Sequence, residues 1–186
     1  PAISVAGGPR ERLQGLFAGK RCGRDLSGGL AVGIATMLVL PVMGLLAGAY
    51  EPAAGLGVGL LARAGLATML AMVVAFIEEL LFRGVIFDLL WRLAGALKGT
   101  LLAALIFALV HFLDPATPSG VVHGHWYSGF QMLWKAILSF NPANPHIFPY
   151  CATLFFIGAS LCLIFAVKRN LYLIAGIHAG WIWVLK

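Results

Sequence analysis

Long apolar stretches without charge are the feature that most constrains what this chain can fold into. Residues 28–50 contain no charged side chain, and residues 56–93 are predominantly apolar for longer than the ~20 residues that one membrane crossing needs. Only 11% of the 186 residues are charged and 61% are hydrophobic, which is too apolar for a soluble domain of this size. Because lipid offers no partners to the backbone, these stretches predict transmembrane helices. The predicted fold class is an all-α, polytopic bundle.

The apolar stretches divide into about five predicted crossings. The entry segment 56–67, which carries Arg63, is predicted to precede the second crossing. A loop rich in Pro, His and aromatic residues follows the third crossing, and residues 129–140 within it are predicted to form a short interfacial helix. Glycines four residues apart predict close helix packing at three places: Gly44 and Gly48, Gly95 and Gly99, Gly176 and Gly180. The predicted crossings are 28–50, 68–91, 97–113, 147–167 and 171–185.

The basic residues predict the orientation of the chain. Of the 13 lysines and arginines, five lie in the tail before the first crossing, and further pairs lie in the turns near Trp91 and Asn170. The opposite side holds Lys135, with Arg63 near that boundary. The positive-inside rule therefore places the N-terminus in the cytoplasm. We accordingly predict a basic cytoplasmic tail over 1–27, a single membrane domain over 28–186 and no binding of nucleic acid, although the net charge is +6.

Two adjacent glutamates and an arginine lie inside the second predicted crossing. Ionisable groups at this depth are costly, and they are functional candidates for that reason. Glu79 and Arg83 are four residues apart in the order that favours a helical ion pair. Glu78 lies about 100° away around the helix, so the spacing leaves it for chemistry or protonation. The alternative interpretation is that both glutamates only tie helices together.

Two histidines lie in later crossings. His111 follows Phe107 by four residues, so the aromatic ring is predicted to pack over the imidazole, and His178 lies between two glycines. A single histidine in an apolar helix is usually a packing residue. However, counting residues from the same cytoplasmic turn puts Glu78 and His111 at a matching depth of roughly 20 Å, with His178 shallower at roughly 12 Å. A glutamate and a histidine at one depth predict an assembled site.

These residues resemble the motifs of the CPBP family, which contains CAAX prenyl endopeptidases and bacteriocin-processing or immunity proteins. The motifs are Glu78-Glu79-x-x-x-Arg83, then Phe107-x-x-x-His111, then His178, and the resemblance covers about residues 68–186. It implies a glutamate-type intramembrane endopeptidase of the bacterial inner membrane, acting on a membrane-anchored protein or peptide without a cofactor. It also implies that Glu78 and His111 activate water, that Glu79 and Arg83 hold the site, and that His178 stabilises the oxyanion.

The chain departs from this family at one position. Many members carry Asn four residues after the last motif histidine, as a second oxyanion donor, and here that position is Ile182. The N–H of Trp181 or Trp183, a backbone N–H or Arg83 are the candidate replacements. Trp181 lies about 60° from the face of His178 and is the best placed of the two tryptophans. The alternative is weak or absent activity.

Other functions are weighed against the endopeptidase. Glu78, His111 and His178 are valid zinc ligands, so a metal site is an alternative, although the His-Glu-x-x-His zinc signature is absent. A Gly-x-Ser-x-Gly elbow is also absent. A non-catalytic relative acting as an immunity or scaffold protein fits Ile182. A proton-coupled transporter would also use buried Glu and His, but the chain has no visible internal repeat.

Overall fold

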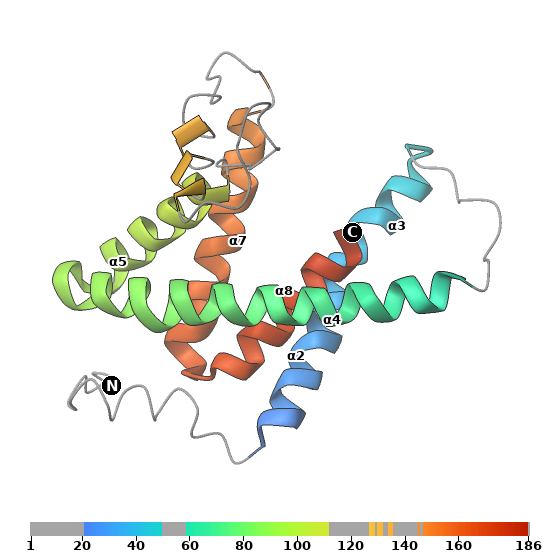
Figure 1. Cartoon of the computed structure of the whole chain (residues 1–186), viewed down its shortest axis with the longest axis horizontal. Coiled ribbons are helices and arrows are strands. Elements are labelled where there is room, and N and C mark those ends of the chain that lie inside the picture. The colour runs from blue at the N-terminus through green and yellow to red at the C-terminus, as the bar shows by residue number, and fades with distance from the viewer. Residues whose placement is uncertain are drawn as a thin grey trace. The chain divides into compact units, whose positions relative to one another are not determined.

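The computed structural model describes residues 21–49, 59–111 and 147–185, together with residues 127–128, 130–131, 134–135 and 145. Most of the basic tail and of the predicted interfacial helix 129–140 lies outside these residues. Every regular element in the described part is a helix, which confirms the all-α class. In chain order they are α2 (Cys22–Met37), α3 (Val39–Leu46), α4 (Gly59–Glu79), the π-helix η1 (Leu80–Phe87), α5 (Asp88–His111), α7 (Ile147–Lys168) and α8 (Leu171–Leu185) (Figure 1).

Three described stretches are long and apolar enough to cross a membrane: Cys22–Leu46, Ala62–His111 and Ile147–Lys168. The second of these is 50 residues long and changes direction at Gly95, where φ is 80° and ψ is 174°. A positive φ of this kind favours glycine. Past that turn, a Cβ on Gly99 would lie 2.8 Å from the backbone of Trp91, so the chain folds back closely on itself. The turn separates the predicted crossings 68–91 and 97–113.

The first two predicted crossings have different bounds in the structure. The first helix begins at Cys22 rather than at residue 28, and it is interrupted at Leu38 before α3. Pro41 has no N–H to donate to the carbonyl of Met37, which explains the interruption. The predicted entry segment is not separate either, because α4 runs from Gly59 and includes Arg63. That part of the sequence contains no proline, and its Leu, Ala and Arg residues are good helix formers.

The π-helix η1 was not predicted, and it keeps one face of the chain buried across the end of α4. The buried positions recur every four residues, at Ala71, Ala75, Glu79, Arg83 and Phe87. In an α-helix a four-residue step turns about 40° past a full turn, so this face would drift steadily. A π-helix has more residues in each turn, so the same step falls short of a full turn and reverses the drift. The site residues Glu79 and Arg83 therefore stay on the buried face.

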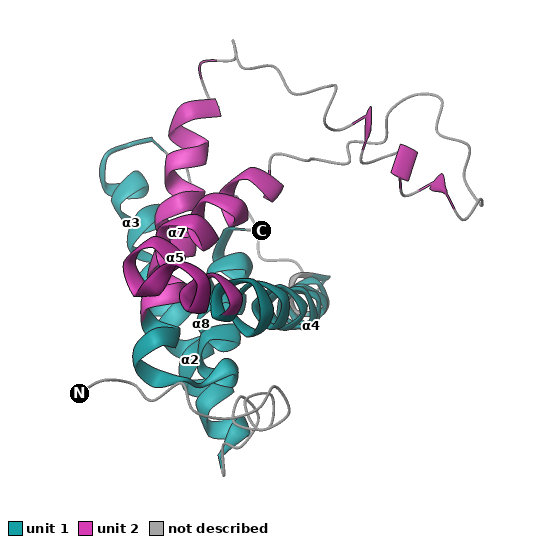
Figure 2. Cartoon of the chain, turned by 90° about the vertical axis from the view of Figure 1, so that its left-hand side faces the viewer, with its two compact units in different colours: residues 1–88, 164–186 teal, residues 89–163 magenta. Residues whose placement is uncertain are grey.

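The chain forms two compact units, residues 1–88 with 164–186 and residues 89–163 (Figure 2). In the first unit, α2 and α8 run in the same direction with backbones in contact. A Cβ on Gly29 would collide with the Leu173 carbonyl oxygen, and one on Gly176 would collide with the Leu26 carbonyl oxygen. The predicted packing at Gly176 and Gly180 is thus confirmed, with α2 as the partner. At Gly48 and Gly95 a Cβ would meet no atom of the described residues within 4 Å, so the structure does not support close packing at these two positions.

Helix α8 also packs against α4, which runs in the opposite direction. The centre of this contact is a buried cluster of Ala71, Ala75 and Ala179, and the partly buried side chains packed on it are Leu30, Met72, Ile182 and Trp183. Small side chains at the centre let the two helices approach closely. The contact positions α8 beside the end of α4, where the glutamates lie.

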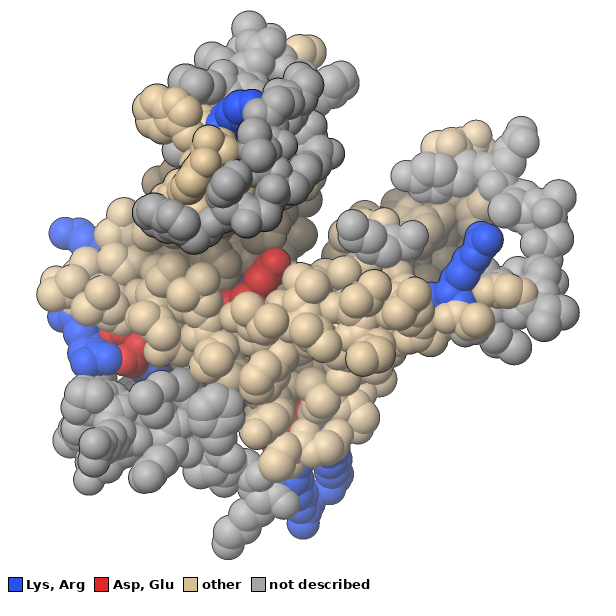
Figure 3. Space-filling view, in the orientation of Figure 1, with Lys and Arg blue, Asp and Glu red and all other residues tan. Residues whose placement is uncertain are grey.

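Apolar side chains dominate the outer surface of the described helices. In Figure 3 most of the visible described surface is neither acidic nor basic. Large hydrophobic residues are exposed on several helices, among them Leu46 at 84%, Leu93 at 75% and Val167 at 78%. A soluble monomer does not expose so much contiguous apolar surface, whereas a bilayer covers it. The protein is an integral membrane protein.

Candidate active site

The predicted ion pair between Glu79 and Arg83 is present at the junction of α4 and η1. Arg83 Nη1 donates to Glu79 Oε1 over 2.9 Å, and both side chains are completely buried. A buried pair is costly to desolvate and depends on good geometry and further hydrogen bonds. Glu79 Oε1 accepts such a further bond, from His178.

His178 lies between the two glutamates. Its Nδ1 is 2.8 Å from Glu79 Oε1, and its Nε2 is 3.7 Å from Glu78 Oε2. The residue count that placed His178 nearer the cytoplasmic turn than Glu78 is therefore corrected. The reason is that α4 and α8 are inclined to each other, so residue counts along each helix do not measure a common depth (Figure 1).

The hydrogen bonds define which nitrogen of His178 carries a proton. An ionised Glu79 can only accept hydrogen bonds, so the Nδ1 of His178 is the donor. In the neutral ring the lone pair then lies on Nε2, on the side of Glu78. In the charged ring both nitrogens carry N–H groups, one toward each glutamate.

Glu78 and Glu79 have different surroundings although they are neighbours in the sequence. The side chain of Glu79 is fully buried with Arg83 and His178, whereas that of Glu78 is 26% exposed. Successive residues of a helix point about 100° apart, so when the side chain of Glu79 points to the buried face, that of Glu78 points away from it. Glu78 is the more accessible of the two side chains in the described structure, although its Oε2, the oxygen nearest His178, is buried.

His111, the fifth predicted site residue, belongs to the second unit and lies at the end of α5. Its Nδ1 is 2.8 Å from the carbonyl oxygen of Phe107, and the two rings lie 4.2 Å apart between centroids. The predicted packing of Phe107 over the imidazole is confirmed. Since a carbonyl oxygen only accepts, Nδ1 is the donor and Nε2 of the neutral ring carries the lone pair.

Both tryptophans considered as oxyanion donors direct their N–H groups to neighbouring helices in this structure, which does not favour an oxyanion role for either. Trp181 Nε1 donates to Thr36 Oγ1 on α2 over 2.9 Å, and Trp183 Nε1 donates to the Ala64 carbonyl over 3.4 Å. Each indole has a single N–H, which the neighbouring helix uses. Ile182 packs against the alanine cluster between α4 and α8.

Among residues 21–49, 59–111 and 147–185, no group of three His, Cys, Asp or Glu side chains is arranged to hold a metal ion. The zinc alternative combines Glu78 and His178 of one unit with His111 of the other. Zinc binding therefore remains a hypothesis for experiment.

Comparison with protein families agrees with the motifs. The model of the type II CAAX prenyl endopeptidase Rce1-like family matches residues 60–184, from the start of α4 almost to the end of α8. The chain belongs to this family. No curated protein and no solved structure matches it. Rce1-like membership identifies a CAAX-type intramembrane endopeptidase that acts on a membrane-associated protein substrate, and all five predicted site residues fall inside the match.

Sequence reasoning missed two features of the site. The π-helix is one of them, because the burial of every fourth position over about four turns, from Ala71 to Phe87, is a property of the folded chain and was not read from the spacing of the residues. The contact of α2 with α8 was predicted only in part. The spacing of Gly176 and Gly180 indicated a closely packed neighbour, but it did not identify Gly29 and Gly33 as that neighbour.

Proposed function

We propose that this Rce1-like protein cleaves a peptide bond of a membrane-anchored protein or peptide with a water molecule activated by Glu78 and His111. The observation that carries the proposal is the inequality of the two glutamates. Glu79 is fully buried with Arg83 and His178, while Glu78 is partly exposed. A general base must reach a water molecule, whereas a residue that only holds the site need not. Glu78 is therefore the proposed base, and Glu79 a positioning residue.

The proposed reaction has two proton transfers. Glu78 takes a proton from water while the water oxygen attacks the carbonyl carbon of the scissile bond and forms a tetrahedral intermediate. The intermediate then collapses, the C–N bond breaks, and the proton passes from Glu78 to the leaving amine. His111 shares the water through Nε2, the nitrogen that carries the lone pair when Nδ1 donates to Phe107. The same water must therefore reach Glu78 and His111.

His178 is the proposed donor to the developing oxyanion. With Nδ1 on Glu79, the ring donates from Nε2 only when both nitrogens are protonated. Glu79 and Glu78, one beside each nitrogen, are the counter-charges for that form. One preorganised donor of this kind contributes about 3–4 kcal/mol to transition-state stabilisation. No metal or other cofactor enters the proposed reaction.

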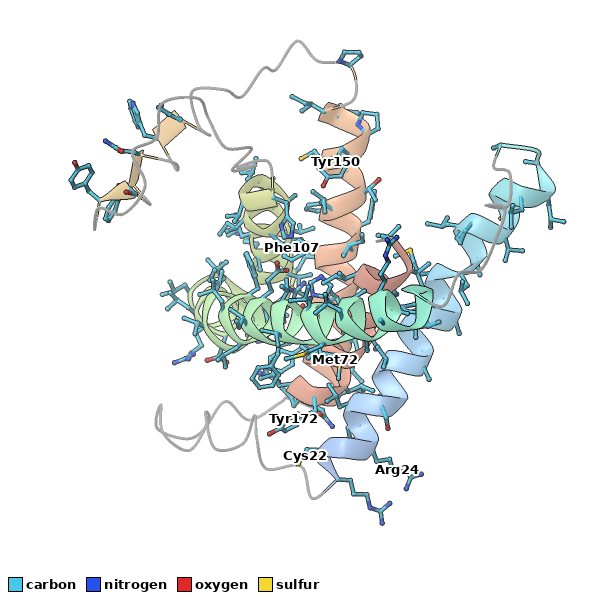
Figure 4. All side chains as sticks on the ribbon, turned by 45° about the vertical axis from the view of Figure 1, so that its right-hand side comes forward. Cys22, Arg24, Met72, Phe107, Tyr150 and Tyr172 are labelled. Carbon is cyan, nitrogen blue, oxygen red and sulfur yellow. The ribbon has the colours of Figure 1, made fainter. Side chains whose placement is uncertain are left out.

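The proposed location is the bacterial inner membrane with the N-terminus in the cytoplasm. Helices α2 and α8 begin at the same end, as Figure 4 shows for Cys22 and Arg24 on α2 and Tyr172 on α8. Asn170, just before α8, donates to Asp25 Oδ2 over 2.7 Å. Arg24, Lys168 and Arg169 therefore lie toward one end, as a positive-inside arrangement requires.

The test is cleavage by purified protein in lipid vesicles. An S-farnesylated peptide ending in a Cys-aliphatic-aliphatic-X sequence is the first probe, because the family acts on CAAX substrates. Mass spectrometry of cell membranes, comparing wild type with Glu78→Gln, then identifies a native peptide that accumulates uncleaved. We expect Glu78→Gln to reduce kcat by about 10²–10⁴-fold while the protein stays folded. Substitutions of residues that act on the same water have non-additive effects on kcat. Adding His111→Ala to Glu78→Gln should therefore reduce kcat little further.

A second candidate function is supported by Ile182. Where many relatives carry an amide, this side chain belongs to an apolar cluster, which fits a non-catalytic immunity or scaffold protein. That function predicts that Glu78→Gln changes no peptide in the membrane and leaves the protein's protective or binding activity intact. Cleavage that depends on Glu78 would exclude it.

A further inference from the structure

Helix α8, which carries His178, is joined to α2 by two hydrogen bonds, one from the residue before α8 and one from a residue past His178. At the start, Asn170 donates to Asp25 Oδ2 over 2.7 Å. One turn past His178, Trp181 Nε1 donates to Thr36 Oγ1 over 2.9 Å. Between these bonds the backbones of the two helices are in contact at the glycines. Helix α2 lies before residue 60, outside the match to the Rce1-like family.

The Thr36 hydroxyl is suited to accept the indole N–H. Its own proton is directed to α2, where Oγ1 lies 2.8 Å from the carbonyl oxygen of Val32 and 3.0 Å from that of Gly33. Threonine commonly makes such bonds to the preceding turn of its helix. A lone pair of Oγ1 therefore remains for Trp181, and the indole can act only as a donor. The roles of the two groups are unambiguous.

The bond to Trp181 restrains the rotation of α8 about its own axis. Trp181 follows His178 by three residues, so the two side chains project about 60° apart, within one turn of each other. Side-chain ends lie roughly 5–6 Å from a helix axis, so a rotation of about 10° moves them by roughly 1 Å. A shift of that size would break the 2.8 Å contact between His178 and Glu79. Misplacement by about 1 Å is also enough to slow catalysis severely.

We propose that Thr36 is a positioning residue, whose hydrogen bond to Trp181 holds α8 in the rotation at which His178 meets Glu79. The proposal rests on the proposed peptidase function and extends it to a helix outside the family match. It also gives Trp181 a structural task in place of the oxyanion role considered from the sequence.

The experiment compares Thr36→Val, which keeps the shape and removes the hydroxyl, with Thr36→Ser, which keeps the hydroxyl. Cleavage is measured per folded protein in vesicles with the farnesylated CAAX probe. We expect Thr36→Val to lower kcat by roughly threefold to twentyfold, the range associated with one interhelical hydrogen bond in a membrane, with KM unchanged. Thr36→Ser should retain most of the wild-type kcat. Trp181→Phe should match Thr36→Val, and the double variant should be no slower than either.

Three results would overturn the proposal: a wild-type kcat in Thr36→Val, an equal loss in Thr36→Ser, or losses in Thr36→Val and Trp181→Phe that multiply. The last result would mean that Trp181 acts independently of Thr36, as an oxyanion donor would.

A second measurement needs no activity. In unfolding titrations, the losses of unfolding free energy caused by Thr36→Val and His178→Gln should be non-additive. The reason is that Thr36→Val already weakens the contact of His178 with Glu79, so His178→Gln then removes less. Additive effects would overturn the proposal as well. Failure of the proposed function has a different signature: wild type and Glu78→Gln would then be equally inactive, while the unfolding cycle would still decide the role of Thr36.

Discussion

Adding a single methyl group to α2 tests the close approach of α2 and α8, and two neighbouring glycines provide a matched pair. A Cβ on Gly29 would collide with the Leu173 carbonyl oxygen and lie 3.1 Å from Gly176 Cα, whereas a Cβ on Gly28 would meet no atom of the described residues within 4 Å. Both substitutions to alanine gain the same helix propensity, about 1 kcal/mol, so this gain cancels in the comparison. What remains is the cost of overpacking, about 1–3 kcal/mol. We expect the upper end, because backbone atoms cannot relieve a clash by changing rotamer.

The measurement is the free energy of unfolding of Gly28→Ala and Gly29→Ala in detergent or bicelles. A difference of about 3 kcal/mol corresponds to more than a hundredfold in the folding equilibrium. Because His178 lies on the helix that would be displaced, Gly29→Ala should also lower kcat, while Gly28→Ala should not. Equal stability and equal kcat for the two variants would refute the close contact of α2 and α8.

Three further predictions concern the site itself. Glu79→Gln should lower turnover, and it should also lower the stability of the fold by about 3–5 kcal/mol, because it removes the charge that compensates buried Arg83. Size-exclusion profiles and thermal unfolding measure the loss of folded protein. Equal, purely catalytic losses in Glu78→Gln and Glu79→Gln would contradict the assignment. Prolonged treatment with phenanthroline or EDTA should leave cleavage intact; inhibition that zinc alone reverses would replace the proposed mechanism with a metal-dependent one. Ile182→Asn should lower the free energy of unfolding by about 1–3 kcal/mol, because it places an amide in the alanine cluster. A kcat above that of wild type would instead show that the amide reaches the oxyanion.

The Gly29 and Thr36 experiments examine the same dependence of the site on α2. The five site residues lie within the region shared with the Rce1-like family, but the helix that packs along α8 does not. Substitutions in α2 are therefore expected to change activity although α2 holds none of the proposed catalytic groups. A positioning residue has this property, because it acts only through the group that it places.

The sequence by itself determined the features that depend on local spacing. Apolar stretches of about 20 residues can be accommodated only as membrane helices, and this predicted the fold class. Glu79 and Arg83 form their ion pair four residues apart, and His111 packs under Phe107 at the same spacing. Each of these contacts joins two residues about one helical turn apart, so the spacing in the sequence already places the two side chains near each other.

Only the tertiary structure decided which distant groups meet. His178 bonds to Glu79, which is 99 residues away, and Trp181 bonds to Thr36, which is 145 residues away. Such contacts depend on the tilt and rotation of whole helices, and those depend on where small residues let backbones touch. The periodicity of one helix carries no information about the rotation of its neighbour. For that reason the sequence could suggest Trp181 as an oxyanion donor, whereas the packing of α8 on α2 directs its N–H to Thr36.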